Sequence, residues 1–276
     1  MKHSNHIKSS GWALVTGSTM GIGFAYAEAL AQQNKSLVLV ARNEDKLVEM
    51  AQDLAQRYKV STKVIAADLS TQAGMNKVIS ETKEISIDLL INNAGKEESG
   101  NFTDNSIDEM LSSISLNCSA PLVLSHHFSG LMGDNGGGSI LFISSIVAFQ
   151  GVPLIANYAA TKSYLLVLAE GLASELKQKD IHISVTAPGF TRSNLSPQIK
   201  FSGTPFKPLD AEFVAQYTLD RLGRQLLIVP GFINKFLFYT GKYIQPRRLN
   251  SFAFGQVFKM VLKDKMNAQK TAGIRS

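Results

Sequence analysis

The feature of this sequence that most constrains its fold is the alternation of short apolar runs with longer, helix-like segments. The runs are rich in aliphatic and β-branched residues and cover 12–16, 36–41, 63–67, 87–91, 139–144, 181–186 and 226–229. Between the first six lie segments long enough for helices, such as 21–33, 44–58 and 157–179. Such alternation is typical of parallel strands covered on both faces by crossover helices. It predicts an α/β fold with one doubly wound, Rossmann-like parallel sheet, whose ligands bind at the carboxyl ends of the strands.

The pattern also predicts how the chain is divided. Residues 1–10 form a polar tail, residues 11–230 a single Rossmann-like catalytic domain, and residues 231–276 a helical extension with a basic tail. The net charge of +6 belongs to this tail, since seven of the 28 Lys and Arg but one of the 22 Asp and Glu lie from Arg247 onward. The first 246 residues are therefore neutral, which argues against a nucleic-acid-binding surface.

Three further features bear on the compartment. The single cysteine, Cys118, permits no intrachain disulfide and fits a reducing environment. The first ten residues lack the apolar segment of a signal peptide, and no uncharged stretch is uniformly apolar enough to span a bilayer. We therefore expect a cytoplasmic protein, with peripheral membrane contact through the basic tail as an open alternative.

The first predicted strand runs directly into the glycine-rich turn Thr16-Gly17-Ser18-Thr19-Met20-Gly21-Ile22-Gly23. Glycines allow a tight turn and a close approach of the backbone to phosphate, and the helix that follows presents free N–H groups to it. The alternative is a simple loop. Because the turn lies between a strand and an Ala-rich helix, it predicts a dinucleotide site with contacts from Gly17, Ser18, Thr19, Gly21, Ile22 and Gly23.

The TGxxxGxG spacing of this turn resembles that of the short-chain dehydrogenases/reductases. The other patterns of that family follow in order over residues 11–195, namely Asn92-Asn93-Ala94-Gly95, Ser145, Tyr158-Ala-Ala-Thr-Lys162 and Pro188-Gly189. The resemblance implies an oxidoreductase that moves a hydride between a nicotinamide cofactor and a carbonyl compound or alcohol.

The end of the second predicted strand bears on the choice of cofactor. An NAD enzyme would carry an acidic residue there to bind the ribose hydroxyls, but this chain has Ala41-Arg42-Asn43. Arg42 can pair with a 2′-phosphate, so we expect NADP(H); the alternative is a solvated arginine. NADP(H)-using relatives often have a second basic residue in the glycine turn, where this chain has Ser18 and Thr19.

The resemblance implies further cofactor contacts. Asp68 and Leu69 would meet the adenine, although Asp68 fits nearly as well as a helix cap for a segment beginning at Ser70 or Thr71. Asn92 and Ala94 would lie beside the adenosine ribose or pyrophosphate, although Asn92 could also join two strands. The remaining cofactor contacts implied are Asn93 and Gly95, together with Pro188, Gly189, Thr191 and Ser193 at the nicotinamide.

Tyr158 and Lys162 are four residues apart at the start of a helix and therefore share a face. A phenol titrates near ~10 in water, too high for acid–base work at neutral pH. A nearby ammonium and an oxidised nicotinamide favour the phenolate, so we expect the pKa of Tyr158 to be lowered. Tyr158 would then exchange a proton with the substrate oxygen, and Lys162 would also bind the nicotinamide ribose.

Ser145 lies at the end of the fifth predicted strand, thirteen residues before the tyrosine, where its hydroxyl can donate to a developing oxyanion. Ser144 is the rival candidate and is expected to point away.

For Asn117 the resemblance implies a bound water that connects Lys162 to solvent. Pro121 lacks an N–H, so it would free the Asn117 carbonyl to hold that water or would simply kink the helix. His126 and His127 have no ligand-type partner at suitable spacing, so we expect no metal site.

The substrate is expected to be an apolar ketone, aldehyde or secondary alcohol, because the residues near Ser145 and Tyr158 are mostly apolar: Ile146, Val147, Phe149, Pro153, Leu154, Ile155 and Phe190. The strand end at Arg42 and the C-terminal extension resemble the branch that contains hydroxysteroid dehydrogenases and 3-ketoacyl-CoA reductases. A catalytically idle dinucleotide-binding sensor or scaffold is the alternative, and the intact set of Ser145, Tyr158, Lys162 and Asn117 argues against it.

The extension carries apolar residues on one predicted helical face: Phe232, Ile233, Phe236, Leu237, Tyr243 and Ile244. Three interpretations stay open. The helix covers the substrate pocket or packs on the core, which we favour; it mediates dimerisation; or it lies on a membrane surface, aided by the basic tail. We expect a homodimer.

Overall fold

The computed structural model describes residues 11–192 and 207–262. Its centre is a seven-stranded sheet in the order β3-β2-β1-β4-β5-β6-β7, in which every neighbouring pair is parallel. The strands are β1 (Trp12–Thr16), β2 (Ser36–Ala41), β3 (Thr62–Ala66), β4 (Ile87–Asn92), β5 (Gly138–Ile143), β6 (Ile181–Thr186) and β7 (Leu227–Ile228). The doubly wound parallel sheet predicted from the sequence is confirmed.

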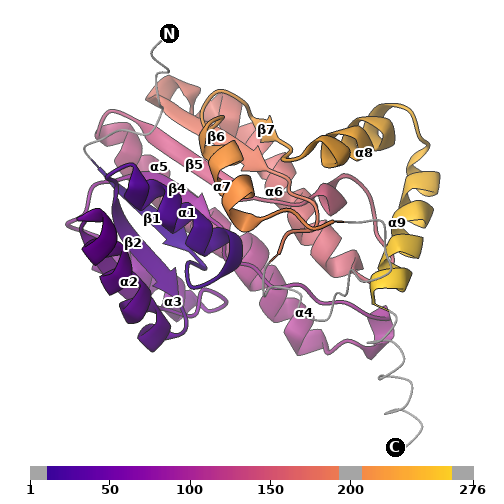
Figure 1. The fold of residues 1–276 in the computed structure, drawn as a ribbon, viewed down its shortest axis with the longest axis horizontal. Helices are drawn as coiled ribbons and strands as arrows, with labels where there is room; N and C mark the ends of the chain where they lie inside the picture. Colours follow the sequence, from indigo (N-terminus) through magenta and orange to yellow (C-terminus); the bar gives the residue numbers. More distant parts are fainter. Residues whose placement is uncertain (1–10, 193–206, 263–276) are drawn as a thin grey trace, which may run out of the picture.

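Helices cover both faces of the sheet (Figure 1). One face carries α1 (Gly21–Gln32), α2 (Glu44–Tyr58) and α7 (Ala211–Leu219), and the other carries α3 (Gln72–Glu81), α5 (Ala120–Asp134) and α6 (Ala156–Glu175). The short helix α4 (Ile107–Ile114) precedes α5, and α8 (Phe232–Tyr243) and α9 (Arg247–Val261) follow β7. The remaining turns are the 3-10 helices η1 (Phe102–Asp104), η3 (Ile146–Phe149) and η4 (Lys177–Lys179) and the π-helix η2 (Ser115–Ser119).

The near-continuous apolar sequence of the strands follows from their burial on both faces. Side chains alternate across a strand, so Ala13 and Val15 of β1 join the core under α1, α2 and α7, whereas Leu14 joins the core under α3, α5 and α6. This two-sided core holds the carboxyl ends of β1 to β6 at one edge of the sheet, where the polar residues singled out above are found.

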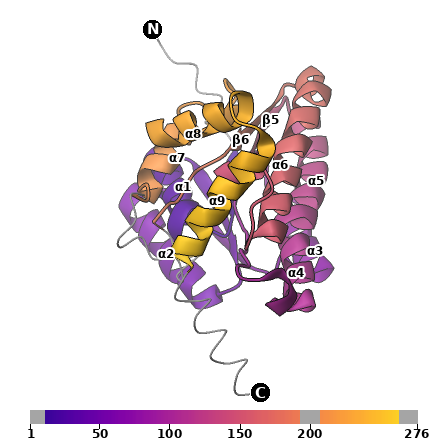
Figure 2. The same cartoon turned by 90° about the vertical axis from the view of Figure 1, so that its right-hand side faces the viewer.

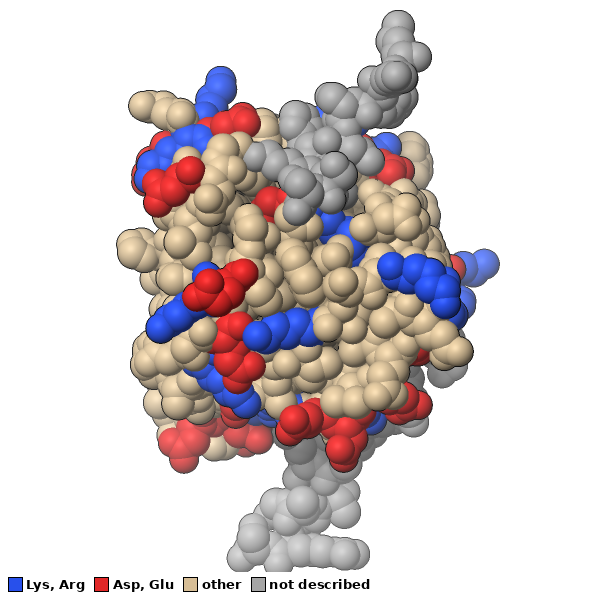
Figure 3. Space-filling view, turned by 90° about the vertical axis from the view of Figure 1, so that its left-hand side faces the viewer, with Lys and Arg blue, Asp and Glu red and all other residues tan. Residues whose placement is uncertain are grey.

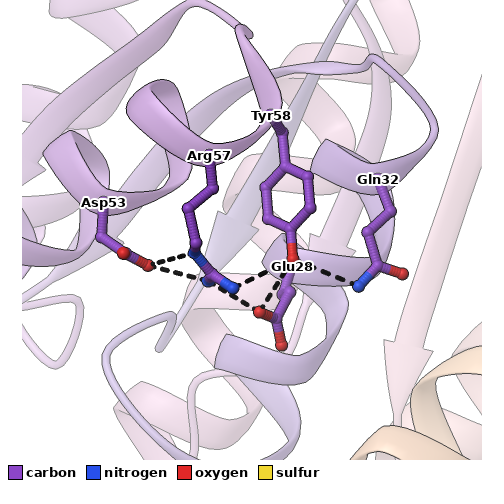
Figure 4. Close-up of polar contacts among 5 residues, drawn as sticks. All are labelled: Glu28, Gln32, Asp53, Arg57 and Tyr58. Carbon is purple, nitrogen blue, oxygen red and sulfur yellow. Dashed lines mark hydrogen bonds and ion pairs between the residues drawn. The ribbon is translucent and has the colours of Figure 1, made fainter.

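Two groups of polar contacts join neighbouring elements away from that edge. Between α1 and α2, the Arg57 guanidinium lies 2.7 Å from Glu28 and from Asp53, and the Tyr58 hydroxyl donates to Glu28 (Figure 4). At the amino-terminal edge of the sheet, the Lys35 ammonium lies 2.6 and 2.7 Å from the two carboxylate oxygens of Asp88. Both members of this second pair are buried.

Pro121 follows a wide turn of the helix. The chain before it forms the π-helix η2, and the N–H of Ala120 bonds to the carbonyl of Ser115, five residues earlier. Pro121 therefore falls in the first turn of α5, where a missing N–H costs little. Asn117 lies within this wide turn.

The C-terminal extension packs on the core through a different side of α8 than the sequence suggested. Phe238 is buried and its ring centroid lies 4.5 Å from that of Phe149, whereas Phe232 and Phe236 are exposed. Phe258 and Val261 of α9, and Leu262 directly after it, share a buried cluster with Ile146 and Tyr158. The Asn250 amide donates to Gln150, 2.9 Å away. Nowhere in residues 11–192 and 207–262 is a helix both long and apolar enough for a membrane span.

Candidate active site

A cavity of about 1350 Å³ runs along the carboxyl ends of the strands. This is where α/β folds of this kind bind their ligands, so the cavity is the candidate ligand site in the part of the chain that the structure describes. It brings together, from segments far apart in the sequence, most of the predicted site residues: Gly17, Thr19, Gly21, Ile22, Gly23, Arg42, Asp68, Leu69, Asn93, Ala94, Gly95, Ser145, Tyr158, Lys162, Pro188, Gly189 and Thr191. Ser18 and Asn117 do not line it, and Ser193 lies outside the described residues.

The glycine-rich turn lines the cavity between β1 and α1. Gly17 has φ +66°, and a Cβ there would lie 2.9 Å from the Cα of Ala94. A Cβ on Gly23 would collide with the carbonyl of Gly17. The packing of the turn against its own neighbours therefore requires glycine at both positions. The turn leads into α1, whose first N–H groups favour an anion. Ser18 is buried, and its hydroxyl points to the carbonyl of Val40, 3.5 Å away. It therefore contacts the end of β2 and does not line the cavity.

Two cations, Arg42 and Lys46, line one end of the cavity. Arg42 follows β2, and Lys46 stands in the first turn of α2, after the N-cap Asn43. A lysine in a first turn opposes the helix dipole, so its presence beside Arg42 is a signal of anion binding that the sequence analysis missed. Asp68 accepts bonds from the N–H and hydroxyl of Ser70 at 2.9 and 2.7 Å. Burial opposes its charge, but these bonds and the charge of Arg42 hold the pKa of Asp68 below its usual range.

The helix-cap interpretation of Asp68 does not hold, because Thr71 caps α3 by accepting from Gly74.

Asn92 and Asn93 have separate roles. Asn92 donates to Ser125 of α5 and is turned away from the cavity, whereas Asn93 donates to the carbonyls of Thr16 and Gly17. Asn93 thereby ties the loop after β4 to the glycine turn, and it is the member of the pair that lines the cavity.

Tyr158 and Lys162 lie one turn apart on α6, with the lysine ammonium 5.5 Å from the centre of the phenol ring. The ammonium donates to the carbonyl of Ile143 at the end of β5, 2.8 Å away. Burial lowers the pKa of Lys162 to about 8. Burial, and then the carboxylates of Glu97 and Glu98, raise the pKa of Tyr158 above its ordinary value. The expected lowering of the tyrosine pKa is therefore not found here, because burial opposes the phenolate.

The two adjacent serines face in opposite directions, as alternation at a strand end predicts. Ser144 is buried and donates to the carbonyl of Lys162 at 2.7 Å. Ser145 lines the cavity, and its hydroxyl makes only long contacts, 3.5 Å to the carbonyl of Pro188 and 3.4 Å from the N–H of Val147. The Ser145 hydroxyl can therefore rotate toward a ligand.

Asn117 is fully buried, and its side chain holds the loop that follows β4. Its amide oxygen accepts from the N–H of Lys96 at 2.9 Å, and its amide nitrogen donates to the Lys96 carbonyl and to the Thr161 hydroxyl. A Cβ on Gly95 would lie 3.2 Å from the Asn117 amide oxygen and 3.4 Å from the Lys162 ammonium. The Asn117 side chain is thus bonded to protein groups and has a positioning role, and these contacts do not test the predicted water at its main-chain carbonyl.

The other end of the cavity is mostly apolar. Ile146 and Val147 follow Ser145, Phe190 follows Gly189, and Phe254 and Phe258 come from α9. The ring centroids of Phe190 and Phe258 are 5.6 Å apart. The sequence analysis missed both α9 phenylalanines, because no local pattern indicates which face of a distant helix will close a cavity. It also missed Glu97, a carboxylate beside Tyr158.

Known proteins share this architecture. The family model for short chain dehydrogenases matches residues 11–201. The human inactive hydroxysteroid dehydrogenase-like protein 1 is 34% identical over 193 residues, covering 69% of this chain and 58% of that protein. Very-long-chain 3-oxoacyl-CoA reductase-B of Danio rerio is 34% identical over 191 residues, covering 67% and 61%. The aligned region thus spans less than two thirds of either relative.

A solved structure extends the comparison. A short-chain dehydrogenase from Sphingobium yanoikuyae, in complex with NADPH, is 31% identical, with a TM-score of 0.76 over 80% of this chain and 88% of that chain. The fold, the ordered motifs and the family match agree. This chain belongs to the short-chain dehydrogenase family and is similar to its hydroxysteroid dehydrogenase and 3-oxoacyl-CoA reductase members.

Proposed function

We propose that this protein is an NADP(H)-dependent oxidoreductase that interconverts an apolar ketone or aldehyde and the corresponding alcohol. The observation that carries the proposal is one cavity with Arg42 and Lys46 at one end and Ser145, Tyr158 and Lys162 at the other. The first pair suits a 2′-phosphate. The second group supplies a hydroxyl donor and a buried proton donor for a carbonyl oxygen.

The residues present fit a nicotinamide dinucleotide. The turn from Gly17 to Gly23 lines the cavity at the start of α1, whose first N–H groups suit phosphates, and Pro188, Gly189 and Thr191 line the same cavity. When bound, the nicotinamide supplies or accepts the hydride. The protein's own part is proton transfer and orientation. Ser145 donates a hydrogen bond to the substrate oxygen, and Tyr158 gives that oxygen its proton during reduction or removes the proton during oxidation.

Lys162 and Asn117 support that transfer. A lysine whose pKa is near 8 can still carry a proton at neutral pH. A charged ammonium near the phenol opposes the rise in the Tyr158 pKa that burial and the two carboxylates cause. Asn117 holds Lys96 and Thr161 and so fixes the loop and the helix on either side of the lysine. The apolar wall from Ile146, Phe190, Phe254 and Phe258 favours a substrate with a hydrophobic body.

The test of this proposal is consumption of NADPH by the purified full-length chain across a panel of apolar ketones and aldehydes. Turnover of at least one member is expected, with larger apolar ketones preferred over acetone. Tight NADPH binding without turnover of any member would favour the idle sensor or scaffold instead.

Replacing Arg42 by Ala should remove most of a preference for NADPH over NADH. A charged hydrogen bond to phosphate contributes about 1.5–3 kcal/mol, or roughly ten- to a hundredfold in affinity. The additional change Lys46→Ala should remove what remains, since both side chains border the same end of the cavity. Titration of each variant with both cofactors measures the effect. Arg57→Ala, on α2 but outside the cavity, is the matched control, and equal affinities in the unaltered protein would contradict the assignment.

Replacing Glu97 by Gln should shift the pH dependence of alcohol oxidation toward lower pH. Oxidation requires the Tyr158 phenolate, so its rate rises with pH through the pKa of this group. The negative charge of Glu97 raises that pKa, and removing the charge lowers it. Rate against pH, measured with a saturating alcohol, gives the midpoint. Glu170→Gln, at an exposed position of α6, should leave the midpoint unchanged. A midpoint that moves to higher pH in the Glu97 variant would show that this reasoning is wrong.

A further inference from the structure

Nine large apolar side chains of the C-terminal extension point into solvent, with exposed fractions from 53% to 84%. We call them the C-terminal aromatic face: Phe232, Ile233, Phe236, Tyr239, Tyr243, Ile244, Leu249, Phe252 and Met260. α8 and α9 lie together at one end of the molecule (Figures 1 and 2). Soluble monomers seldom gather this much exposed apolar surface without a partner for it.

The helical spacing explains how the face forms. Phe232, Phe236, Tyr239 and Tyr243 recur at intervals of three and four residues, so they make one stripe along α8. The opposite side of α8 is already used, because Phe238 packs on Phe149. α9 is divided in the same way. Its buried side carries Phe258 to the cavity wall, and its outer side carries the exposed residues Leu249, Phe252 and Met260.

The segment of sequence that carries this face has charges of one sign. The chain has no Asp or Glu between Asp220 and Asp264, but it has eight Lys and Arg there. Arg247 and Arg248, at the start of α9, and Lys259 near its end are exposed. The opposite end of the molecule differs, since basic and acidic side chains are mixed on it (Figure 3). Aromatic and aliphatic side chains bordered by cations suit a surface that is apolar within and anionic at its boundary.

A second copy of the chain fits this face less well. In a twofold contact the same patch meets itself, so Arg247 and Arg248 would approach their own equivalents. No acidic residue of the neighbouring sequence is available to pair with them. A contact that buries the aromatic stripe would therefore also bring these like charges together. That juxtaposition of like charges costs free energy.

We propose that the C-terminal aromatic face docks on an anionic lipid surface, with α8 and α9 lying in the plane of the interface. The aromatic stripe enters the acyl boundary, and Arg247, Arg248 and Lys259 contact lipid phosphates. Phe254 and Phe258 of α9 face the cavity, so docking also places the apolar end of the cavity beside the bilayer. Delivery of a membrane-dissolved substrate through this end rests on the proposed function, whereas docking itself does not.

The test is sedimentation of the full-length protein with vesicles of phosphatidylcholine alone or mixed in equal parts with phosphatidylglycerol. We expect binding to the mixed vesicles that weakens as salt is added, because salt screens the cations. The variant Phe232→Ser/Phe236→Ser/Tyr243→Ser should bind at least about tenfold more weakly, since one buried aromatic side chain already contributes that much. Arg247→Gln/Arg248→Gln should bind more weakly to mixed vesicles only.

The matched control is Phe102→Ser/Ile107→Ser/Val167→Ser, whose side chains are equally exposed but lie elsewhere, and it should bind like the unaltered protein. Unchanged NADPH binding and melting temperature show that each variant is folded. No vesicle binding, or equal binding to both vesicle types, would overturn the proposal. So would conversion of a dimer to a monomer by the triple serine variant, because the face would then be a contact between copies.

Delivery of substrate has a separate readout. The triple serine variant should lose NADPH-dependent reduction of a long-chain ketone dissolved in the vesicles and keep reduction of a small soluble ketone. Loss of both activities would overturn delivery. An unaltered protein that binds vesicles but reduces neither ketone would contradict the proposed function and leave the docking result in support.

Discussion

Replacing Tyr158 by Phe should lower kcat for ketone reduction by about two to four orders of magnitude, because a positioned general acid contributes that much. The substitution removes one hydroxyl from a side chain that is otherwise packed among Ile146, Val147 and Ala159. The fold and the dinucleotide end of the cavity should therefore be little affected. Single-turnover rates and NADPH titration of the same preparation separate the two effects.

Two further variants test whether the loss of activity is specific to the Tyr158 hydroxyl. Tyr164→Phe, six residues later on the same helix and partly exposed, should keep full activity. Lys162→Ala should weaken both turnover and NADPH binding, since the proposed role of the lysine includes both. Substantial ketone reduction by the Tyr158 variant would mean that another group supplies the proton.

Replacing Lys35 by Met should lower the free energy of unfolding by about 3–5 kcal/mol, because it leaves the Asp88 carboxylate buried without its cation. The side chains of Lys35 and Asp88 are only 2% and 8% exposed, and their charged groups are 2.6 Å apart. Urea unfolding followed by circular dichroism measures the change. The pair lies at the amino-terminal edge of the sheet, so NADPH affinity of the folded variant should not change.

A double substitution tests whether the unpaired charge of Asp88 causes the loss of stability. Lys35→Met/Asp88→Asn should recover part of the lost stability, since the group that remains buried is then neutral. Lys83→Met, at an exposed position, should stay near the stability of the unaltered protein. A Lys35 variant as stable as the parent would mean that water reaches the Asp88 carboxylate.

The sheet could be predicted from the sequence because burial on both faces leaves each strand as a continuous apolar run. The predicted strands differ from the observed ones by no more than one residue at either end. Most of the candidate site could be predicted for a related reason. Parallel strands place their carboxyl ends at one edge, so residues that follow different strands, such as Arg42, Asn93 and Ser145, must converge.

What could not be predicted depends on contacts between distant segments. The outward orientation of the α8 stripe requires knowing that Phe238, and not Phe236, meets Phe149. The π-helical turn at Ser115–Ser119 arises between two helices and has no local sequence period of its own. The raised pKa of Tyr158 depends on burial and on Glu97 and Glu98, which lie some sixty residues away in the chain.

The position of α9 has a consequence for the order in which the protein acquires its parts during synthesis. Among the described residues, every one proposed to hold the cofactor precedes Arg192, and so do β1 to β6, whereas Phe254 and Phe258 are translated later. Domains begin to fold while the ribosome is still adding residues. A nascent chain can therefore build the dinucleotide end of its cavity first and meet the cofactor while the substrate end is still an open groove.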